Sequence, residues 1–262
     1  MNAFEMEDSS PQLVSMAISL MLIKFHSVVF IKADVTSWES QVAALKLALQ
    51  SSPRGRIDHF IANAGVSGHN LSKSMFPKDK DGDTASLPAP KLNAINVSLI
   101  GSYYTMCLAA HHFTNSPAWK DDAQADRSLV LLGSLSSYRS IPLGTDYAAA
   151  KMGMRGLFTS ARETMQWYRS KIRVNMLSPQ FIETAMTKHA RQWYEREGFR
   201  YCDIGDAVRV LLRLVEDDTI RGRSLAVNAE GPHDLNDDVS GGDGWLQVEK
   251  LLQSGLLPSW KY

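Results

Sequence analysis

Short apolar runs alternate along the chain with longer segments of helical periodicity. The apolar runs that have the length of buried strands lie at residues 28–34, 59–65, 128–133, 172–179 and 224–228. Apolar positions repeating at helical intervals predict helices at about 37–49, 93–113, 145–168 and 204–215. Strands and helices in this alternation indicate parallel βαβ units, so we expect an α/β fold built on a parallel sheet.

Other segments do not follow this rhythm. Residues 13–23 are apolar, but acidic residues precede them, and the run is shorter than the about 20 residues of a membrane span. We therefore expect an atypical N-terminal helix within residues 1–26. The polar stretch 68–91 predicts a surface excursion, and the aromatic and charged stretch 184–202 predicts a substrate lid. The aromatic residues of this lid are Trp193, Tyr194, Phe199 and Tyr201.

The composition limits the classes of partner. The 262 residues show no break in composition, so we expect a single domain spanning residues 1–262. Lys and Arg number 28 and Asp and Glu also number 28, which provides no excess charge to attract nucleic acid or an anionic membrane. A small molecule or a protein is the expected partner. The two cysteines, Cys107 and Cys202, indicate neither a disulfide framework nor a metal site, and they suit the reducing cytoplasm.

The stretch from 133 to 151 carries the strongest chemical signal. Ser134 follows an apolar run, and Tyr147 and Lys151 are four residues apart, which places both side chains on one face of a helix. Tyr-x-x-x-Lys alone occurs often by chance. Without a function, it would be a helix face on which a solvated lysine lies beside a half-buried tyrosine.

The ends of two other predicted strands strengthen the signal. Asp34 and the sequence Asn63-Ala64-Gly65 come at the ends of apolar runs, where an open parallel sheet places its ligands. Each could be an ordinary turn, but their order along the chain favours one shared site.

These residues resemble the short-chain dehydrogenase/reductase family over about residues 28–227. The resemblance is carried by Ala33-Asp34-Val35, Asn63-Ala64-Gly65, Ser134, Tyr147, Lys151, Ile172-Arg173-Val174-Asn175 and Ser178-Pro179. It implies a Rossmann-like, doubly wound parallel sheet that binds NAD or NADP and transfers hydride between the cofactor and an alcohol or ketone. It also implies a homodimer or homotetramer that pairs through the helices beginning near 93 and 145.

The resemblance also assigns roles to individual residues. It makes Ser134, Tyr147 and Lys151 catalytic, with Tyr147 as the acid or base, and it implies no metal. The residues that it places at the cofactor are Asp34, Asn63, Tyr147, Lys151, Ile182 and Thr184. A cation about 4 Å from a phenolate is worth roughly 4 kcal/mol at an effective dielectric near 20, so we expect Lys151 to lower the pKa of Tyr147.

The chain departs from the family pattern at three places. The first glycine is Gly55, so the glycine-rich phosphate loop that opens the family pattern is missing, and we expect a fold truncated at the N-terminal strand, loop and helix. Ser98 occupies the position of an asparagine that kinks a helix in the family. Gln180 follows Pro179 where a glycine is usual.

Two functions are compatible with these features. The first is an NAD(P)-dependent oxidoreductase that interconverts a secondary alcohol and a ketone on a small apolar or aromatic molecule, in secondary metabolism. A coding start upstream of Met1 would reconcile this function with the missing loop. The alternative is a catalytically inactive member of the family that acts as a binding or scaffold subunit.

Overall fold

The computed structural model describes most of the chain between residues 28 and 237. The described residues are 28–68, 89–119, 122, 125–139, 144–184, 186–188, 191–196, 198 and 200–237. The predicted helix within 1–26, most of the excursion 68–91 and the C-terminal residues after 237 lie outside this part.

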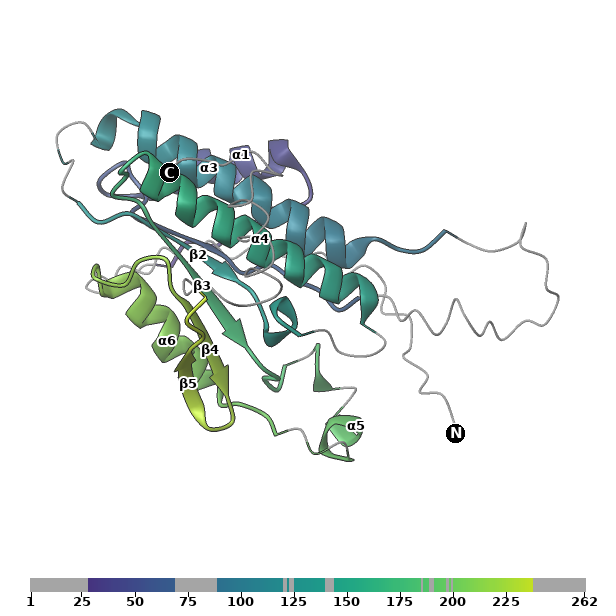
Figure 1. Ribbon diagram of the computed structural model, residues 1–262. Helices are drawn as coiled ribbons and strands as arrows, with labels where there is room; N and C mark the ends of the chain where they lie inside the picture. Colours follow the sequence, from purple (N-terminus) through teal and green to yellow (C-terminus); the bar gives the residue numbers. More distant parts are fainter. Residues whose placement is uncertain are drawn as a thin grey trace, which may run out of the picture.

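A five-stranded sheet forms the centre of the molecule (Figure 1). Its strands, in spatial order, are β1 (His59–Ala62), β2 (Ser128–Leu132), β3 (Arg173–Pro179), β4 (Ser224–Asn228) and β5 (Gly231–Asp234). β1 to β4 are parallel, and β5 returns antiparallel to β4. The predictions of β1 to β4 are confirmed. β5 was not predicted, because Gly-Pro-His-Asp has no apolar alternation and is held by pairing with β4 alone.

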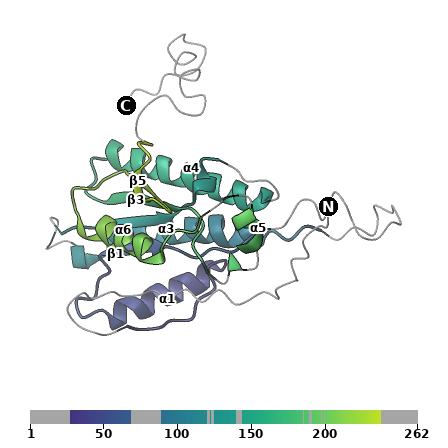
Figure 2. The ribbon, with the colours of Figure 1, turned by 90° about the horizontal axis from the view of Figure 1, so that it is seen from below.

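Helices cover both faces of the sheet. The three helices on one face are α1 (Trp38–Ser51), α3 (Gly101–Asn115) and α4 (Thr145–Trp167), and α6 (Ile204–Glu216) covers the other (Figures 1 and 2). Three shorter helical segments are η3 (Pro117–Trp119), η4 (Leu135–Ser137) and α5 (Arg191–Arg196). The expected α/β class, with a parallel sheet between helical layers, is confirmed.

The helix predicted at 93–113 begins differently from the rest. Its first turns form a π-helix, η2 (Ile95–Ile100), which continues directly into α3. Ser98 lies within η2 and is fully buried, and its hydroxyl accepts a hydrogen bond from the backbone N–H of Val66 at 3.4 Å. π-helical turns are rare and occur frequently at functional sites, so η2 indicates that a functional site lies nearby.

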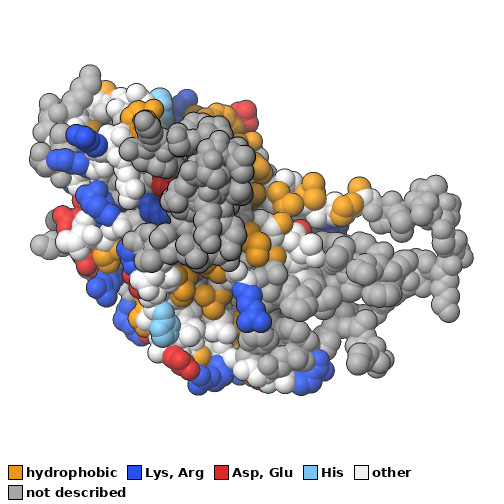
Figure 3. Space-filling view, in the orientation of Figure 1, with side chains coloured by type: hydrophobic (Ala, Val, Ile, Leu, Met, Phe, Trp, Pro, Cys, Tyr) orange, Lys and Arg blue, Asp and Glu red, His pale blue; other side chains and the backbone are white. Residues whose placement is uncertain are grey.

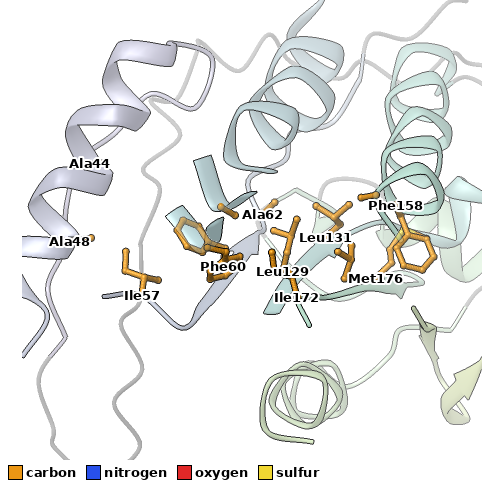
Figure 4. Close-up of a cluster of buried hydrophobic side chains, with 14 of the residues drawn as sticks. Ala44, Ala48, Ile57, Phe60, Ala62, Leu129, Leu131, Phe158, Ile172 and Met176 are labelled. Atoms are coloured by element: carbon orange, nitrogen blue, oxygen red, sulfur yellow. The ribbon is translucent and has the colours of Figure 1, made fainter. Parts of the chain in front are cut away.

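The core has two parts, one on each face of the sheet. Alternate residues of β2 point to opposite faces, so Leu129 and Leu131 join one cluster and Val130 joins the other. Figure 4 shows the larger cluster, where the β-strand side chains lie between Ala48 of α1 and Phe158 of α4. The smaller cluster packs β2, β3 and β4 against α6.

The predicted strand at 28–34 is wrong. This segment belongs to no strand, and Val28 and Phe30 are 76% and 64% exposed. Its alternate residues Ile31 and Ala33 are buried. The apolar pattern therefore arises because one side of the segment packs against the core, not because the segment is a strand of the sheet. No described strand pairs with it, and β1 is therefore an edge of the described sheet.

Acidic and basic side chains lie close together along the lower left margin of the face in Figure 3. Among the described residues, no helix combines the length and apolar character needed to cross a membrane.

Candidate active site

Ser134 lies at the carboxyl end of β2, where its orientation is fixed by its own turn. It is the N-cap of η4, and its hydroxyl accepts a hydrogen bond from the backbone N–H of Ser136 at 3.1 Å. The Ser137 hydroxyl accepts in return from the Ser134 backbone N–H at 3.2 Å. This reciprocal capping holds a largely buried hydroxyl at the edge of the sheet, where ligands bind in open α/β folds.

Gly133 allows this turn to lie close to β3. A Cβ atom at this position would be 2.9 Å from both the Met176 sulfur and the Ser178 hydroxyl, nearer than such atoms approach. Glycine is thus required for packing just before Ser134.

Helix α4 brings the other two predicted residues to the same place. The Asp146 carboxylate accepts a hydrogen bond from the Tyr147 backbone N–H at 2.9 Å and stabilises the first turn. One turn later, Lys151 is 5% exposed, and its Nζ donates to the Leu132 carbonyl at 2.7 Å. This hydrogen bond joins α4 to the end of β2, and it places Nζ 5.7 Å from the centre of the Tyr147 ring.

The electrostatics of Tyr147 differ from the sequence-based expectation. Burial raises the pKa of the Tyr147 phenol, and hydrogen bonding by the Ser134 hydroxyl opposes this rise only in part. The Lys151 ammonium faces the ring and binds the Leu132 carbonyl, so it does not lower the pKa of the phenol towards 7. The phenol is protonated near neutral pH, the state needed of a general acid.

Lys151 is affected by burial in the opposite sense. Removal from water disfavours the ammonium and lowers its pKa to about 8. Lys151 is therefore mostly charged at pH 7 but loses its proton far more easily than an exposed lysine.

The turn after β1 closes the site from another side. A Cβ atom at Gly65 would be 3.5 Å from the Ser98 hydroxyl and 3.9 Å from Lys151 Nζ, so the backbone of Asn63-Ala64-Gly65 passes beside the lysine. Ser98 was identified only as a departure from a family pattern, and it lies in this wall. The Asn63 side chain is exposed.

The other predicted cofactor residues make local contacts. The Asp34 carboxylate accepts hydrogen bonds from the Thr36 backbone N–H and hydroxyl at 2.9 and 2.8 Å. Ile182 forms a parallel bridge with Cys202, and the backbone N–H of Thr184 donates to the Thr187 hydroxyl at 3.0 Å. The structure thus brings together Ser134, Tyr147 and Lys151, whereas roles for Asp34, Ile182 and Thr184 stay predictions.

The predicted lid at 184–202 is described in part. Its only helix in that part is α5, and Arg191 at its start binds the Glu183 and Glu195 carboxylates at 2.9 and 2.8 Å. The Tyr201 hydroxyl donates to the Thr187 carbonyl at 3.3 Å. The side chains of Trp193, Tyr194 and Phe199 lie outside the described part, so the lid also stays a prediction.

Sequence reasoning missed a polar cluster beside the site. It joins Tyr138 and Arg155 to Ser224 and Asp237. Asp237 is 99 residues from Tyr138, and no local pattern connects them.

Comparison with known proteins identifies the class. A family model described as short chain dehydrogenase matches residues 7–195. Together with the parallel sheet and the site, this match shows that the chain belongs to the short-chain dehydrogenase/reductase family and is an oxidoreductase. Membership implies a nicotinamide cofactor.

Two named dehydrogenases are similar in sequence over most of this chain. The chain is 34% identical over 221 residues to the 5′-hydroxyaverantin dehydrogenase of Dothistroma septosporum, covering 81% of this chain and 70% of that protein. It is 33% identical over 201 residues to the NADP-dependent dehydrogenase M3 of a Phoma species, covering 74% of this chain and 58% of that one.

A solved structure agrees with the fold. The 3-oxoacyl-[acyl-carrier protein] reductase of Brucella melitensis in complex with NAD superposes with a TM-score of 0.63 and 20% identity, covering 78% of this chain and 77% of that chain.

Proposed function

We propose that this oxidoreductase interconverts a secondary alcohol and a ketone on a small apolar or aromatic molecule, as part of secondary metabolism. The observation that carries the proposal is the cluster of a buried hydroxyl, a half-buried phenol and a buried ammonium at the carboxyl ends of the strands, formed by Ser134, Tyr147 and Lys151. The similarity to a dehydrogenase named for 5′-hydroxyaverantin supports both the reaction class and the kind of substrate.

The proton chemistry follows from the geometry. In ketone reduction the Tyr147 phenol gives its proton to the carbonyl oxygen, and the Ser134 hydroxyl holds that oxygen by donating a hydrogen bond. The Lys151 ammonium, held by the Leu132 carbonyl 5.7 Å from the centre of the Tyr147 ring, places a positive charge on one side of the site. The bound nicotinamide supplies or accepts the hydride.

The residues at this site suit the nicotinamide end of the cofactor. Gly65 leaves the backbone without a side chain beside Lys151, and the ammonium and phenol are hydroxyl-binding groups that would hold the ribose. Asn63, Asp34, Ile182 and Thr184 remain candidates for the rest of the cofactor. The described residues include no glycine-rich loop between a strand and a helix, so we assign no pyrophosphate contact.

The proposal extends to assembly and location. Tyr103 on α3 and Met152 on α4 are 44% and 42% exposed, which supports pairing of these helices in a homodimer or homotetramer. The free thiols of Cys107 and Cys202 suit the reducing cytoplasm.

Turnover tests the proposed reaction directly. The purified chain should oxidise NADH or NADPH in the presence of members of a panel of aromatic and polycyclic ketones, and the preferred cofactor should emerge from parallel assays at 340 nm. Tyr168→Phe, at the 76% exposed end of α4, is a matched control that should keep full activity. A folded protein that binds neither nicotinamide cofactor would contradict the proposal and favour a binding subunit.

Lys151 predicts an unusual pH dependence of stability. Because its pKa falls from 10.5 to about 8 on folding, the folded state holds fewer protons between these values, and stability rises with pH there. The free energy of unfolding of the wild type, relative to Lys151→Met, should therefore rise by about 2 to 3 kcal/mol between pH 7 and pH 10. Urea unfolding at several pH values measures this, and a difference independent of pH would show that Lys151 is not buried as a cation.

A further inference from the structure

A second polar cluster lies next to the catalytic residues and has no part in the proton step. Arg155, one turn beyond Lys151 on α4, binds Asp237 Oδ1 through Nε at 3.1 Å and Nη2 at 2.6 Å. Its guanidinium also lies 4.5 Å from the centre of the Tyr138 ring. The Asp237 side chain is 2% exposed, and this paired geometry satisfies its buried charge.

The hydrogen bonds of the cluster run in one direction. Tyr138 Oη lies 2.9 Å from Asp237 Oδ2 and 2.7 Å from Ser224 Oγ. A phenol has one proton and a carboxylate only accepts, so Tyr138 donates to Asp237 and receives a hydrogen bond from Ser224. Ser224 Oγ in turn lies 3.4 Å from Ser178 Oγ on β3.

The cluster connects the two elements that carry the catalytic groups. Tyr138 is the C-cap of η4, the turn whose N-cap is Ser134. Arg155 lies on α4 with Tyr147 and Lys151, at the same four-residue spacing, and so on the same face of the helix. Asp237 binds both Tyr138 and Arg155, and it therefore spans the gap between the turn and the helix.

We propose that Tyr138, Arg155 and Asp237 are positioning residues that hold the Ser134 hydroxyl in register with the Tyr147 phenol. The inference rests on the proposed function for its effect on catalysis. A shift of about 1 Å between catalytic groups can cost about a hundredfold in rate, so a clamp between their two supports has a measurable kinetic effect.

Tyr138→Phe is the sharpest variant, because it removes one hydroxyl and leaves the ring under Arg155. We expect kcat for ketone reduction to fall by about 10- to 100-fold, while the KM for the ketone and the Kd for the nicotinamide change less than about threefold. Arg155→Met should act similarly, and Arg155→Lys should recover part of kcat because a cation still reaches the carboxylate.

Arg223→Met is the matched control. Arg223 binds Asp234 at 2.8 Å and Asn236 at 3.0 Å, and so anchors the same C-terminal segment through side chains other than Asp237. This variant should keep the wild-type kcat. A decrease in kcat equal to that of Tyr138→Phe would show that loosening the hairpin is sufficient, and it would overturn the inference.

Amide hydrogen exchange of the cofactor-free protein separates this inference from the proposed function. Exchange in residues 133–139 should be faster in Tyr138→Phe than in the wild type or Arg223→Met. Unchanged exchange there, or faster exchange with an unchanged kcat, overturns the positioning role. A wild-type protein without turnover contradicts the proposed function, and the exchange measurement then decides whether the clamp exists.

Discussion

Tyr147→Phe is expected to lower kcat for ketone reduction by about 10²- to 10⁴-fold, the usual contribution of a positioned general acid. The substitution removes one oxygen and leaves the half-buried ring in place beside Lys151. It therefore removes the proton donor with little change in packing. Single-turnover reduction, followed by the loss of nicotinamide absorbance, measures the chemical step without product release.

The midpoint of thermal unfolding distinguishes this loss from a folding defect. Tyr147→Phe should unfold within a few degrees of the wild type, because the substitution removes one hydroxyl and keeps the half-buried ring in place. Retention of more than about a tenth of wild-type kcat would assign the proton to another donor and remove Tyr147 from the mechanism.

The pH dependence of reduction should follow from the same groups. Both the Tyr147 phenol and the Lys151 ammonium are protonated at neutral pH, and the ammonium is lost as pH rises through about 8. The cofactor-free protein therefore holds both groups in the protonated state that ketone reduction would require. Oxidation of the alcohol needs the phenolate, which burial opposes.

Much of the fold could be predicted from local patterns. The apolar runs at β1 to β4 and the periodicity of α1, α3, α4 and α6 are properties of neighbouring residues, and the structure confirms each of them. The segment 28–34 has the same apolar pattern as a strand but no described partner, and strand formation depends on pairing. Pairing is set by residues distant in sequence, so a local pattern does not predict it.

The candidate site shows the same division. The spacing of Tyr147 and Lys151 predicts a shared helix face, and their placement near Ser134 follows from α4 packing beside β2. The spacing alone predicted that Lys151 lowers the pKa of Tyr147, but this effect depends on the direction in which Nζ points. The Leu132 carbonyl decides that direction, and no sequence pattern indicates a backbone acceptor.

The clamp formed by Tyr138, Arg155 and Asp237 was missed for a related reason. Each of its residues is unremarkable in its local segment, and the cluster exists only because β4 and β5 bring Asp237 back beside α4. Catalytic groups on one short stretch can be recognised from spacing, but the residues that support them come from anywhere in the chain.

Arg173→Met is expected to lower the free energy of unfolding by about 3 kcal/mol, because it removes the buried partner of an ion pair whose other partner, Asp126, is 26% exposed. The Arg173 side chain is 0% exposed and pairs with Asp126. Its guanidinium also donates to the carbonyls of Leu214 at 2.7 Å, Val215 at 2.8 Å and Ile220 at 3.1 Å. These carbonyls lie at the end of α6 and the loop beyond it, so Arg173 fixes α6 to β3.

Arg191→Met provides the control, because the ion pairs of Arg191 with Glu183 and Glu195 are about half exposed and should contribute less than about 1 kcal/mol.

The contribution of Arg173 to the free energy of unfolding should also depend on pH. Burial acts to raise the pKa of Asp126, but the hydrogen bond and charge of Arg173 outweigh it, and the pKa is lowered overall. The pair therefore contributes fully above the ordinary pKa of aspartate, about 4, and its contribution is lost as pH falls below that value. Urea unfolding at pH 7 and pH 3 should show the difference between wild type and Arg173→Met shrinking in acid, and an undiminished difference would mean that the carbonyl contacts carry the whole effect.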